Sequence, residues 1–308
     1  MIKTQERVIF QAFGLSIRSD FHLPELSLLS DIQGDADVEV TMADLTNLWS
    51  ELVPANQGIL IYEDKVIFEI PDTAIFLIQD GKRITISPVK HAEESKIRLY
   101  LLGTCMGAIL MQRRILPLHG SAIAIDGKAY AIVGHSGAGK STLASAFINH
   151  GYSLLSDDVI PISFDSADQP VVTPAYPQQK LWQESLTHFG METSRYDPIF
   201  QRETKYTIPV PSNFTTETLP LAAVFELVKY DGEQVCLQEI PRLTGLSRLF
   251  QHTYRQTFLA PLGLLDWHFS TSARMMKNID MYQLNRPTSG FTAHQLVSLV
   301  LDTIHEEE

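Results

Sequence analysis

The sequence predicts a mixed α/β fold, in which a β-rich N-terminal domain precedes a domain built around a glycine-rich loop. Up to about residue 92, short runs rich in β-branched residues alternate with clusters of Asp, Gly and Pro, which is the pattern of strands joined by turns. Further on, an apolar run leads into the glycine-rich loop and a helical pattern follows it, as in α/β domains. We therefore divide the chain into domains at residues 1–92 and 93–308.

The first domain is expected to be a meander with strands at residues 38–41, 58–62, 65–70, 73–78 and 83–87. The second domain opens with a helix over residues 93–114, whose middle is apolar on most faces and should be deeply buried. Next, the turn Asp126-Gly127 joins two apolar strands, 121–125 and 128–133, into a hairpin.

The later elements are expected as a helix over 142–150, strands over 152–155 and 159–162, proline-rich loops over 172–220, a hairpin of 221–228 with 234–240, mainly helices from 244 onward, and a strand near 280–284. Gly151 ends the first of these helices as a C-cap. Ser156-Asp157-Asp158 stands at the exit of the strand over 152–155.

Composition narrows the class of protein. The net charge of −12 disfavours binding to DNA or RNA, because an acidic surface repels phosphates. Cys105 and Cys236 form no CxxC pair, so we expect neither a zinc site nor a disulfide framework. The N-terminus lacks the apolar region of a signal peptide, and the longest apolar run has about 13 residues where a membrane helix needs roughly 20. We expect a cytoplasmic protein without a nucleic-acid or membrane partner.

The glycine-rich loop matches the phosphate-binding pattern G-x-x-x-x-G-K-[ST]. The nucleotide-binding residues expected from it are Gly134, His135, Ser136, Gly137, Ala138, Gly139, Lys140, Ser141 and Thr142. In such loops the backbone N–H groups and the helix dipole hold phosphate oxygens, the lysine binds the β- and γ-phosphates, and the Ser141 hydroxyl binds Mg²⁺. A chance glycine turn would not explain the apolar strand before the loop and the helix after it. We therefore expect ATP as co-substrate and Mg²⁺ as cofactor.

Asp157 and Asp158 follow the next buried strand, so two adjacent strands should deliver them and the loop to one edge of the sheet. Phosphoryl transfer needs one carboxylate to hold Mg²⁺ and another to accept the proton of the attacking hydroxyl. The residues alone do not decide which aspartate has which role. For an isolated Asp-Asp pair, a solvated turn would be the simpler interpretation.

His119 stands at the start of the hairpin whose second strand enters the loop, so antiparallel pairing should bring it near Gly134. A histidine there could bind a phosphate or move a proton, although most histidines are simply packed residues. Phosphoryl transfer also needs a cation on the transferring group. The sequence does not rank the candidates Lys205, Arg242, Arg248, Arg255 and Arg274.

Residues 118–162 resemble the catalytic domain of HPr serine kinase/phosphorylase, which is related to PEP carboxykinase. The resemblance rests on His119-Gly120, the hairpin, the loop and Ser156-Asp157-Asp158-Val159. It implies that His119, Lys140 and Asp158 are catalytic, with Asp158 as the base toward a serine hydroxyl, and that Ser141 is a Mg²⁺ ligand. We assign Asp157 as a further Mg²⁺ ligand. The family's segment with a metal-binding glutamate is not recognisable, no matching arginine can be located, and Thr142 replaces an acid that is usual in these kinases. These departures point away from HPr itself as the substrate and from phosphorylase activity.

Two further segments are similar to HPr-kinase-like proteins that accompany ribosomally made peptides, among them the lasso peptide kinases. They are residues 12–20 with Leu23-Pro24-Glu25-Leu26, and Pro174-Ala175-Tyr176-Pro177 with Leu181-Trp182. This resemblance implies a peptide partner, the precursor peptide, whose C-terminal serine receives the phosphate. A nucleotide-dependent switch without transfer and a small-molecule kinase stay open as alternatives. The oligomeric state, including a homo-oligomer, stays open as well.

Overall fold

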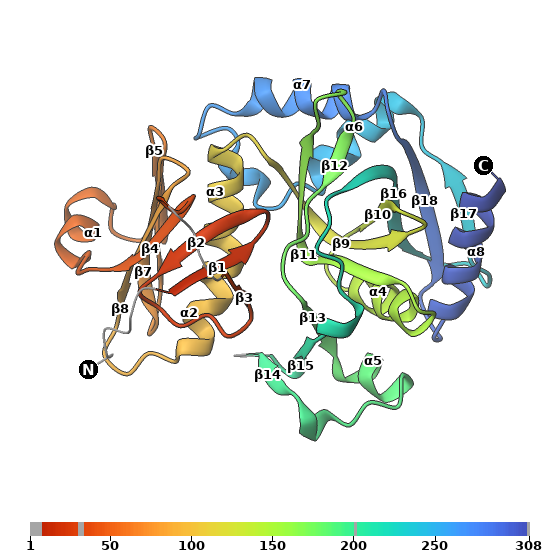
Figure 1. Ribbon diagram of the computed structural model, residues 1–308, viewed down its shortest axis with the longest axis horizontal. Coiled ribbons are helices and arrows are strands. Elements are labelled where there is room, and N and C mark those ends of the chain that lie inside the picture. The colour runs from red at the N-terminus through yellow and green to blue at the C-terminus, as the bar shows by residue number, and fades with distance from the viewer. Residues whose placement is uncertain (1–7, 30–33, 200–201, 307–308) are drawn as a thin grey trace. The chain divides into compact units, whose positions relative to one another are not determined.

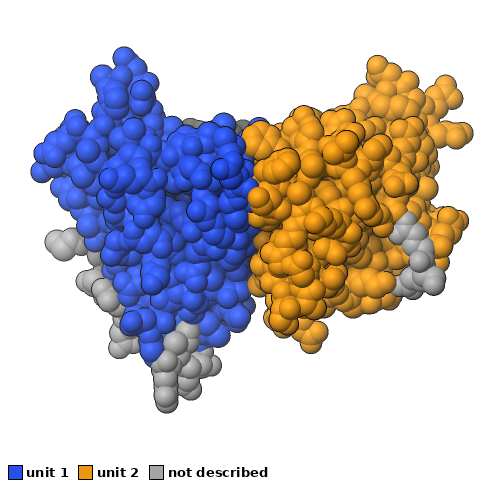
Figure 2. Space-filling model, turned by 90° about the horizontal axis from the view of Figure 1, so that it is seen from above, with its two compact units in different colours: residues 1–117, 255–268 blue, residues 118–254, 269–308 orange. Residues whose placement is uncertain are grey.

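The computed structural model describes residues 8–29, 34–199 and 202–306. The chain forms two compact units, which Figure 2 colours separately. Unit 1 contains residues 1–117 and 255–268, and unit 2 contains residues 118–254 and 269–308. Residues 93–117 are thus grouped with unit 1, and the domain boundary that we placed at residue 92 stays a prediction. Among the described helices, none has both the length and the apolar character needed to cross a membrane.

Unit 1 is built on a sheet whose described strands run in the order β3-β1-β2-β4-β8-β7-β6-β5. The strands are β1 (Val8–Ala12), β2 (Leu15–Ser19), β3 (Ser27–Leu28), β4 (Val38–Met42), β5 (Ile59–Tyr62), β6 (Lys65–Ile70), β7 (Ala74–Gln79) and β8 (Arg83–Pro88). All the strands predicted in this region are confirmed as β4 to β8. Strands β5 to β8 form the expected meander, whereas β4 pairs in parallel with both β2 and β8.

The helix predicted over residues 93–114 is present in unit 1. It runs through α2 (Glu94–Tyr100), one π-helical segment η1 (Leu101–Cys105) and α3 (Met106–Gln112). All residues of η1 and all but the last residue of α3 are buried, as the apolar composition predicted. The π-helical segment was not predicted, because a π-bulge has no sequence pattern of its own. The shorter helices of the unit are α1 (Thr46–Leu52) and η4 (Gln256–Phe258).

Unit 2 has a main sheet with the described strand order β10-β9-β11-β12-β16-β18-β17 and an additional parallel pairing of β10 with β16. Its strands are β9 (Leu116–Ile125), β10 (Lys128–Val133), β11 (Ser153–Phe164), β12 (Pro170–Val172), β16 (Leu219–Tyr230), β17 (Cys236–Glu239) and β18 (Asp280–Pro287). A small second sheet contains β13 (Gln178–Trp182), β15 (Arg202–Pro209) and β14 (Asp197–Ile199). The helices are α4 (Lys140–Asn149), α5 (Gln183–His188), α6 (Arg242–Gln251), α7 (Leu265–Met275, which begins in unit 1) and α8 (Ala293–Glu306), with the 3-10 turns η2 (Thr193–Arg195) and η3 (Pro211–Asn213).

Helices α4 and α8 pack together on the main sheet of unit 2 (Figure 1). The buried residues of α8 are Ala293, Leu296, Val297, Val300 and Ile304. This spacing places them on one face of the helix, where they pack with apolar residues of α4 and of strands β9, β10, β16 and β18. The helix that leaves the glycine-rich loop is therefore anchored by a core on one side.

Three predictions for unit 2 were wrong, two of them about strand pairing. Strands β16 and β17 both exist, but β18 lies between them, so they form no hairpin. The segment 172–220, expected to be loops, contains the second sheet of unit 2 and α5. Strand β11 is continuous from residue 153 to 164, and β9 separates it from β10. These pairings join segments distant in sequence, which local patterns do not encode.

Candidate functional site

The glycine-rich loop connects β10 to α4, as the sequence predicted. Gly134, Gly137 and Gly139 have φ angles of 148°, 80° and 109°, which favour glycine. A Cβ on Gly134 would lie 2.5 Å from the carbonyl oxygen of Leu227, so no larger residue fits there without a shift of the backbone. The loop therefore has the conformation that a phosphate-binding concavity requires.

Lys140 is the first residue of α4 and is 8% exposed. Its Nζ donates hydrogen bonds to the carbonyl oxygens of Gly134 (2.8 Å) and His135 (3.2 Å), so the ammonium lies over the loop. Burial lowers the pKa of Lys140, and the charges of Asp157 and Asp158 oppose that effect. The ammonium is held where the phosphates of a nucleotide on this loop would lie.

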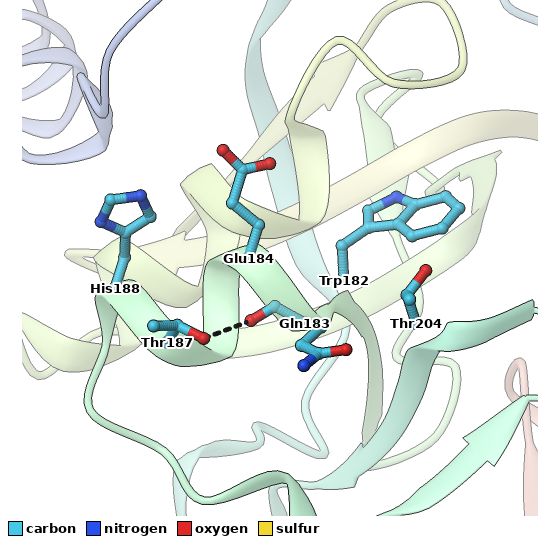
Figure 3. Close-up of a pocket in the computed structure, with 6 residues that line it drawn as sticks. All are labelled: Trp182, Gln183, Glu184, Thr187, His188 and Thr204. Carbon is cyan, nitrogen blue, oxygen red and sulfur yellow. Dashed lines mark hydrogen bonds between the residues drawn. The ribbon is translucent and has the colours of Figure 1, made fainter.

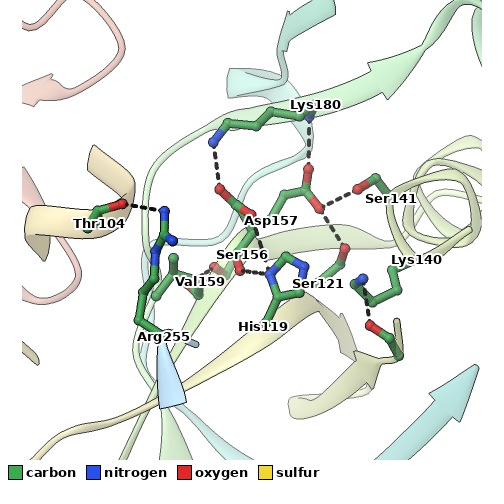
Figure 4. Close-up of polar contacts among 12 residues, drawn as sticks. Thr104, His119, Ser121, Lys140, Ser141, Ser156, Asp157, Val159, Lys180 and Arg255 are labelled. Atoms are coloured by element: carbon green, nitrogen blue, oxygen red, sulfur yellow. Dashed lines mark hydrogen bonds and ion pairs between the residues drawn. The ribbon is translucent and has the colours of Figure 1, made fainter. Parts of the chain in front are cut away.

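Asp157 is buried and accepts three hydrogen bonds. Its Oδ1 accepts from the hydroxyls of Ser121 (2.6 Å) and Ser141 (3.0 Å), and its Oδ2 accepts from the backbone N–H of Lys180 (2.8 Å). These contacts join β9, β11, β13 and the first turn of α4 at one point (Figure 4). The carboxylate next to the loop is therefore fixed in position.

Asp158 lies beside Asp157 on the same strand, yet both side chains reach the same site. In a regular strand, successive side chains point to opposite faces. Asp158 has a φ of 82°, which breaks this alternation at a cost of about 1–3 kcal/mol. Its Oδ2 accepts a hydrogen bond from Nζ of Lys180 at 2.7 Å. Contrary to the sequence-based prediction, the acidic pair lies inside a continuous strand, and this local distortion brings it to the loop.

The electrostatics of Asp158 result from opposing effects. Burial raises the pKa of its carboxyl, but the ammonium of Lys180 and the imidazole of His119 lower it by more than burial raises it, so the net pKa is well below the ordinary value. Burial likewise lowers the pKa of Lys180, and Asp158 more than compensates, so that pKa is raised. Both groups are charged at neutral pH, and the Asp158 side chain keeps 24% of its surface exposed. The site thus presents an ionised, accessible carboxylate.

His119 lies on β9, next to Gly120, which pairs with Val133 at the end of β10. The hairpin register therefore confirms that the histidine is beside the loop entrance. Its Nδ1 is 3.0 Å from the backbone oxygen of Asp158 and 3.4 Å from its Oδ1. Because a carbonyl only accepts, Nδ1 carries the proton and Nε2 is left as an acceptor in the neutral ring. Burial lowers the pKa of His119 in spite of the neighbouring aspartates.

The structure separates the five cation candidates. Lys205 has its Nζ 5.5 Å from the ring centre of Trp182, and its charge acts on Asp158 and Lys140. The other four are exposed or paired with other side chains. Arg242 is exposed, Arg248 pairs with Glu226, Arg274 pairs with Asp168, and Arg255 donates to Thr104 inside unit 1.

Four residues near the loop were missed from the sequence: Ser121, Lys180, Glu226 and Arg286. Nε of Arg286 donates to the carbonyl oxygen of Ala138 in the loop at 2.7 Å. Buried Glu226 pairs with Nε2 of His252 at 2.8 Å, and the backbone oxygen of His252 accepts from the N–H of His119. The one available signal was that Ser121 and Glu226 lie on the predicted strands 121–125 and 221–228, whereas Arg286 lies two residues beyond the strand predicted near 280–284. Lys180 had none, because β13 falls in a segment expected to be loops.

The oxygen atoms at Ser141 and Asp157 fit a magnesium ion. Mg²⁺ prefers hydroxyl and carboxylate oxygens, and keeps few protein ligands beside phosphates and water. Here a serine hydroxyl and a carboxylate oxygen lie 3.0 Å apart at the first turn of α4. When bound, Mg²⁺ would offset the charge of the β- and γ-phosphates. The roles of these two residues stay predictions.

No protein-family model matches the chain. The chain is 28% identical over 114 residues to the HPr kinase/phosphorylase of Lactobacillus gasseri, covering 34% of this chain and 35% of that protein. The same identity and coverage hold for the HPr kinase/phosphorylase of Lactobacillus johnsonii. The match thus spans about a third of the length of these relatives. A solved structure of the Hpr(Ser) kinase/phosphatase from Coxiella burnetii is 15% identical, with a TM-score of 0.34, and covers 62% of this chain and 97% of that one.

Over these 114 residues the chain is similar to HPr kinase/phosphorylases, the family that the motifs in residues 118–162 also resemble. The mixed α/β architecture, with a β-rich N-terminal part and a strand–loop–helix in the second part, is confirmed by the structure itself.

Proposed function

We propose that this protein is an ATP-dependent kinase that phosphorylates a serine hydroxyl of a peptide or protein. The observation that carries this proposal is the joining of the loop to the acidic pair. Ser141 of the loop helix and Asp157 share a hydrogen bond, and the ionised Asp158 stands next to them in contact with Lys180 and His119. A nucleotide-binding module without transfer would not require a second, accessible carboxylate at this point.

In the proposed reaction, ATP lies on the loop with Lys140 at its β- and γ-phosphates. The oxygen of the acceptor serine forms a bond to the γ-phosphorus while the bond to the β–γ bridging oxygen breaks, so that ADP leaves. Asp158 takes the proton of the serine hydroxyl. A carboxylate with a low pKa is a weak base, but it suffices where the transition state is loose and the hydroxyl proton departs late.

Lys180 and His119 act on Asp158 and are positioning residues in this proposal. Lys180 keeps the carboxylate of Asp158 ionised and fixes one of its oxygens. The Nδ1–H of the His119 ring donates to the backbone oxygen of Asp158 and holds it in place. Of the five cation candidates, Lys205 has a charge that acts on Asp158 and Lys140, and its Nζ lies 5.5 Å from the ring centre of Trp182. We further propose the C-terminal serine of a lasso precursor peptide as the acceptor, on the resemblance of the N-terminal segment and residues 174–182.

The test is transfer from labelled ATP·Mg²⁺ to a precursor peptide ending in serine, to the same peptide ending in alanine, and to HPr. Asp158→Asn should lower transfer about 10²–10⁴-fold, because it removes the proton acceptor, and should leave ATP affinity largely intact. Asp302→Asn, an exposed change on α8, is the matched control. Full activity of Asp158→Asn would overturn the assignment. Hydrolysis of ATP without a labelled acceptor would favour a switch.

A further inference from the structure

A cavity of 480 Å³ lies along α5 and the end of β13 (Figure 3). Its lining residues are Trp182, Gln183, Glu184, Thr187, His188 and Thr204. Cavities that bind small molecules usually have about 300–1,000 Å³ and combine an aromatic wall with a few polar groups. This cavity has an indole that is 40% exposed, a carboxylate, two threonine hydroxyls and an imidazole.

The direction of a nucleotide on the loop leads to this cavity. Lys140 and Ser141 mark the β- and γ-phosphates, and backbone N–H groups of the loop hold the α- and β-phosphates. The γ-phosphate must face Asp158 if the proposed transfer is correct. The nucleoside therefore leaves the loop at its other end, beyond the first residues of α4. There the hydroxyl of Thr142 is 2.7 Å from the hydroxyl of Ser185 on α5.

An electrostatic interaction also links α5 to the loop through Arg286. Arg286 donates to the carbonyl oxygen of Ala138, and the charge of Glu184 acts on the same guanidinium. Glu184 and His188, one helical turn apart, project to the same side of α5 in Figure 3. His188 in turn stacks on Phe291 at a ring distance of 4.2 Å, so the ring is held in place. The wall of the cavity nearest the loop is thus well fixed.

We propose that this cavity binds the nucleoside of ATP, with the base against the indole of Trp182 and the ribose hydroxyls on the carboxylate of Glu184. Every base has a π-face, and an aromatic side chain stacks on it. A carboxylate accepts hydrogen bonds from ribose hydroxyls, as the acidic residue of dinucleotide-binding folds does. Nucleotide discrimination would then reside in α5 and the end of β13. This inference rests on the proposed function for the direction of the triphosphate.

Binding measurements test the cavity without any transfer reaction. Trp182→Ala should weaken ATP binding about 5- to 100-fold, the loss that follows from removing a stacked base, and should leave the Kd of inorganic tripolyphosphate unchanged. Trp182→Phe should recover most of the ATP affinity, because an aromatic ring remains. The other two tryptophans, Trp49 and Trp267, lie in unit 1. In the Trp49→Phe/Trp267→Phe protein, the tryptophan fluorescence therefore comes from Trp182 alone. ATP should quench that fluorescence, and tripolyphosphate should not.

The ribose contact has its own test. Wild-type protein should prefer ATP over 2′,3′-dideoxy-ATP, and Glu184→Gln should lose that preference. Glu192→Gln, which removes an exposed carboxylate paired with Arg195, is the matched control and should keep it. Equal losses of ATP and tripolyphosphate affinity in Trp182→Ala would overturn the proposal. So would unchanged ATP affinity with a raised KM for the acceptor alone, which would make the cavity a peptide groove. Because these assays need no acceptor, they can succeed even if the protein transfers no phosphate.

Discussion

At the scale of single residues, the chemistry of the site is decided by Lys180. Burial alone would raise the pKa of Asp158 and bring its carboxyl closer to neutrality at mildly acidic pH. Lys180 contributes twice, through its ammonium on Asp158 and through its backbone N–H on Asp157. One residue of β13 therefore fixes both carboxylates and keeps the exposed one ionised.

Lys180→Met should therefore change the pH dependence of transfer. Without the ammonium, the largest opposing charge is lost and burial raises the pKa of Asp158. A base must be deprotonated, so the acidic limb of the kcat/KM profile should move to higher pH. Lys180→Arg should keep the limb near its wild-type position, and Lys277→Met, an exposed change, should not move it. A profile of unchanged shape in Lys180→Met would exclude this positioning role.

At the scale of elements, the hairpin β9–β10 holds His119 at the loop through a very close approach of two strands. A Cβ at Gly120 would lie 2.2 Å from the backbone oxygen of Ile132, and a backbone atom cannot move aside as a flexible side chain can. Gly120 is therefore required at this position, and the register of the hairpin depends on it.

Gly120→Ala should destabilise the protein by about 1–3 kcal/mol, because the strands must separate to admit the methyl group. Because His119 is the adjacent residue, transfer should fall even under conditions where the variant is folded. Gly58→Ala is the control. A Cβ there would meet nothing within 4 Å, so that variant should be neutral or stabilised by up to about 1 kcal/mol. Urea unfolding gives both values, and equal stability of the two variants would contradict the close-approach argument.

The same scale shows what the sequence could predict. The hairpin, the loop, α4 and the meander of unit 1 were predicted because each is encoded by turn residues and periodicity within a short segment. His119, Lys140 and the acidic pair came with them. The position of β18 between β16 and β17, and the sheet that carries Lys180, depend on pairing between distant segments. Lys180 comes close to Asp158 only in the folded chain, so the sequence pattern did not identify Lys180 as a site residue.

At the scale of the whole molecule, an acidic chain gathers several basic side chains beside the acidic pair at one site. The net charge is −12, yet Lys140, Lys180 and Arg286 contact the loop or the acidic pair, and the charge of Lys205 acts there. Such a local field attracts an anionic nucleotide while the remaining surface repels polyanions. All of these side chains belong to unit 2.

Binding of ATP should therefore stabilise unit 2 selectively. At ATP·Mg²⁺ concentrations of 100 times the Kd, the gain is about 2.7 kcal/mol for the state that binds. Hydrogen exchange should then slow in α4, β10 and β11, whereas β5 to β8 of unit 1 should exchange as before. Lys140→Met should abolish the difference, because it removes the ammonium from the β- and γ-phosphates. An equal slowing in β5 to β8 would show instead that the two units open together, and ATP would then report on the stability of the whole chain.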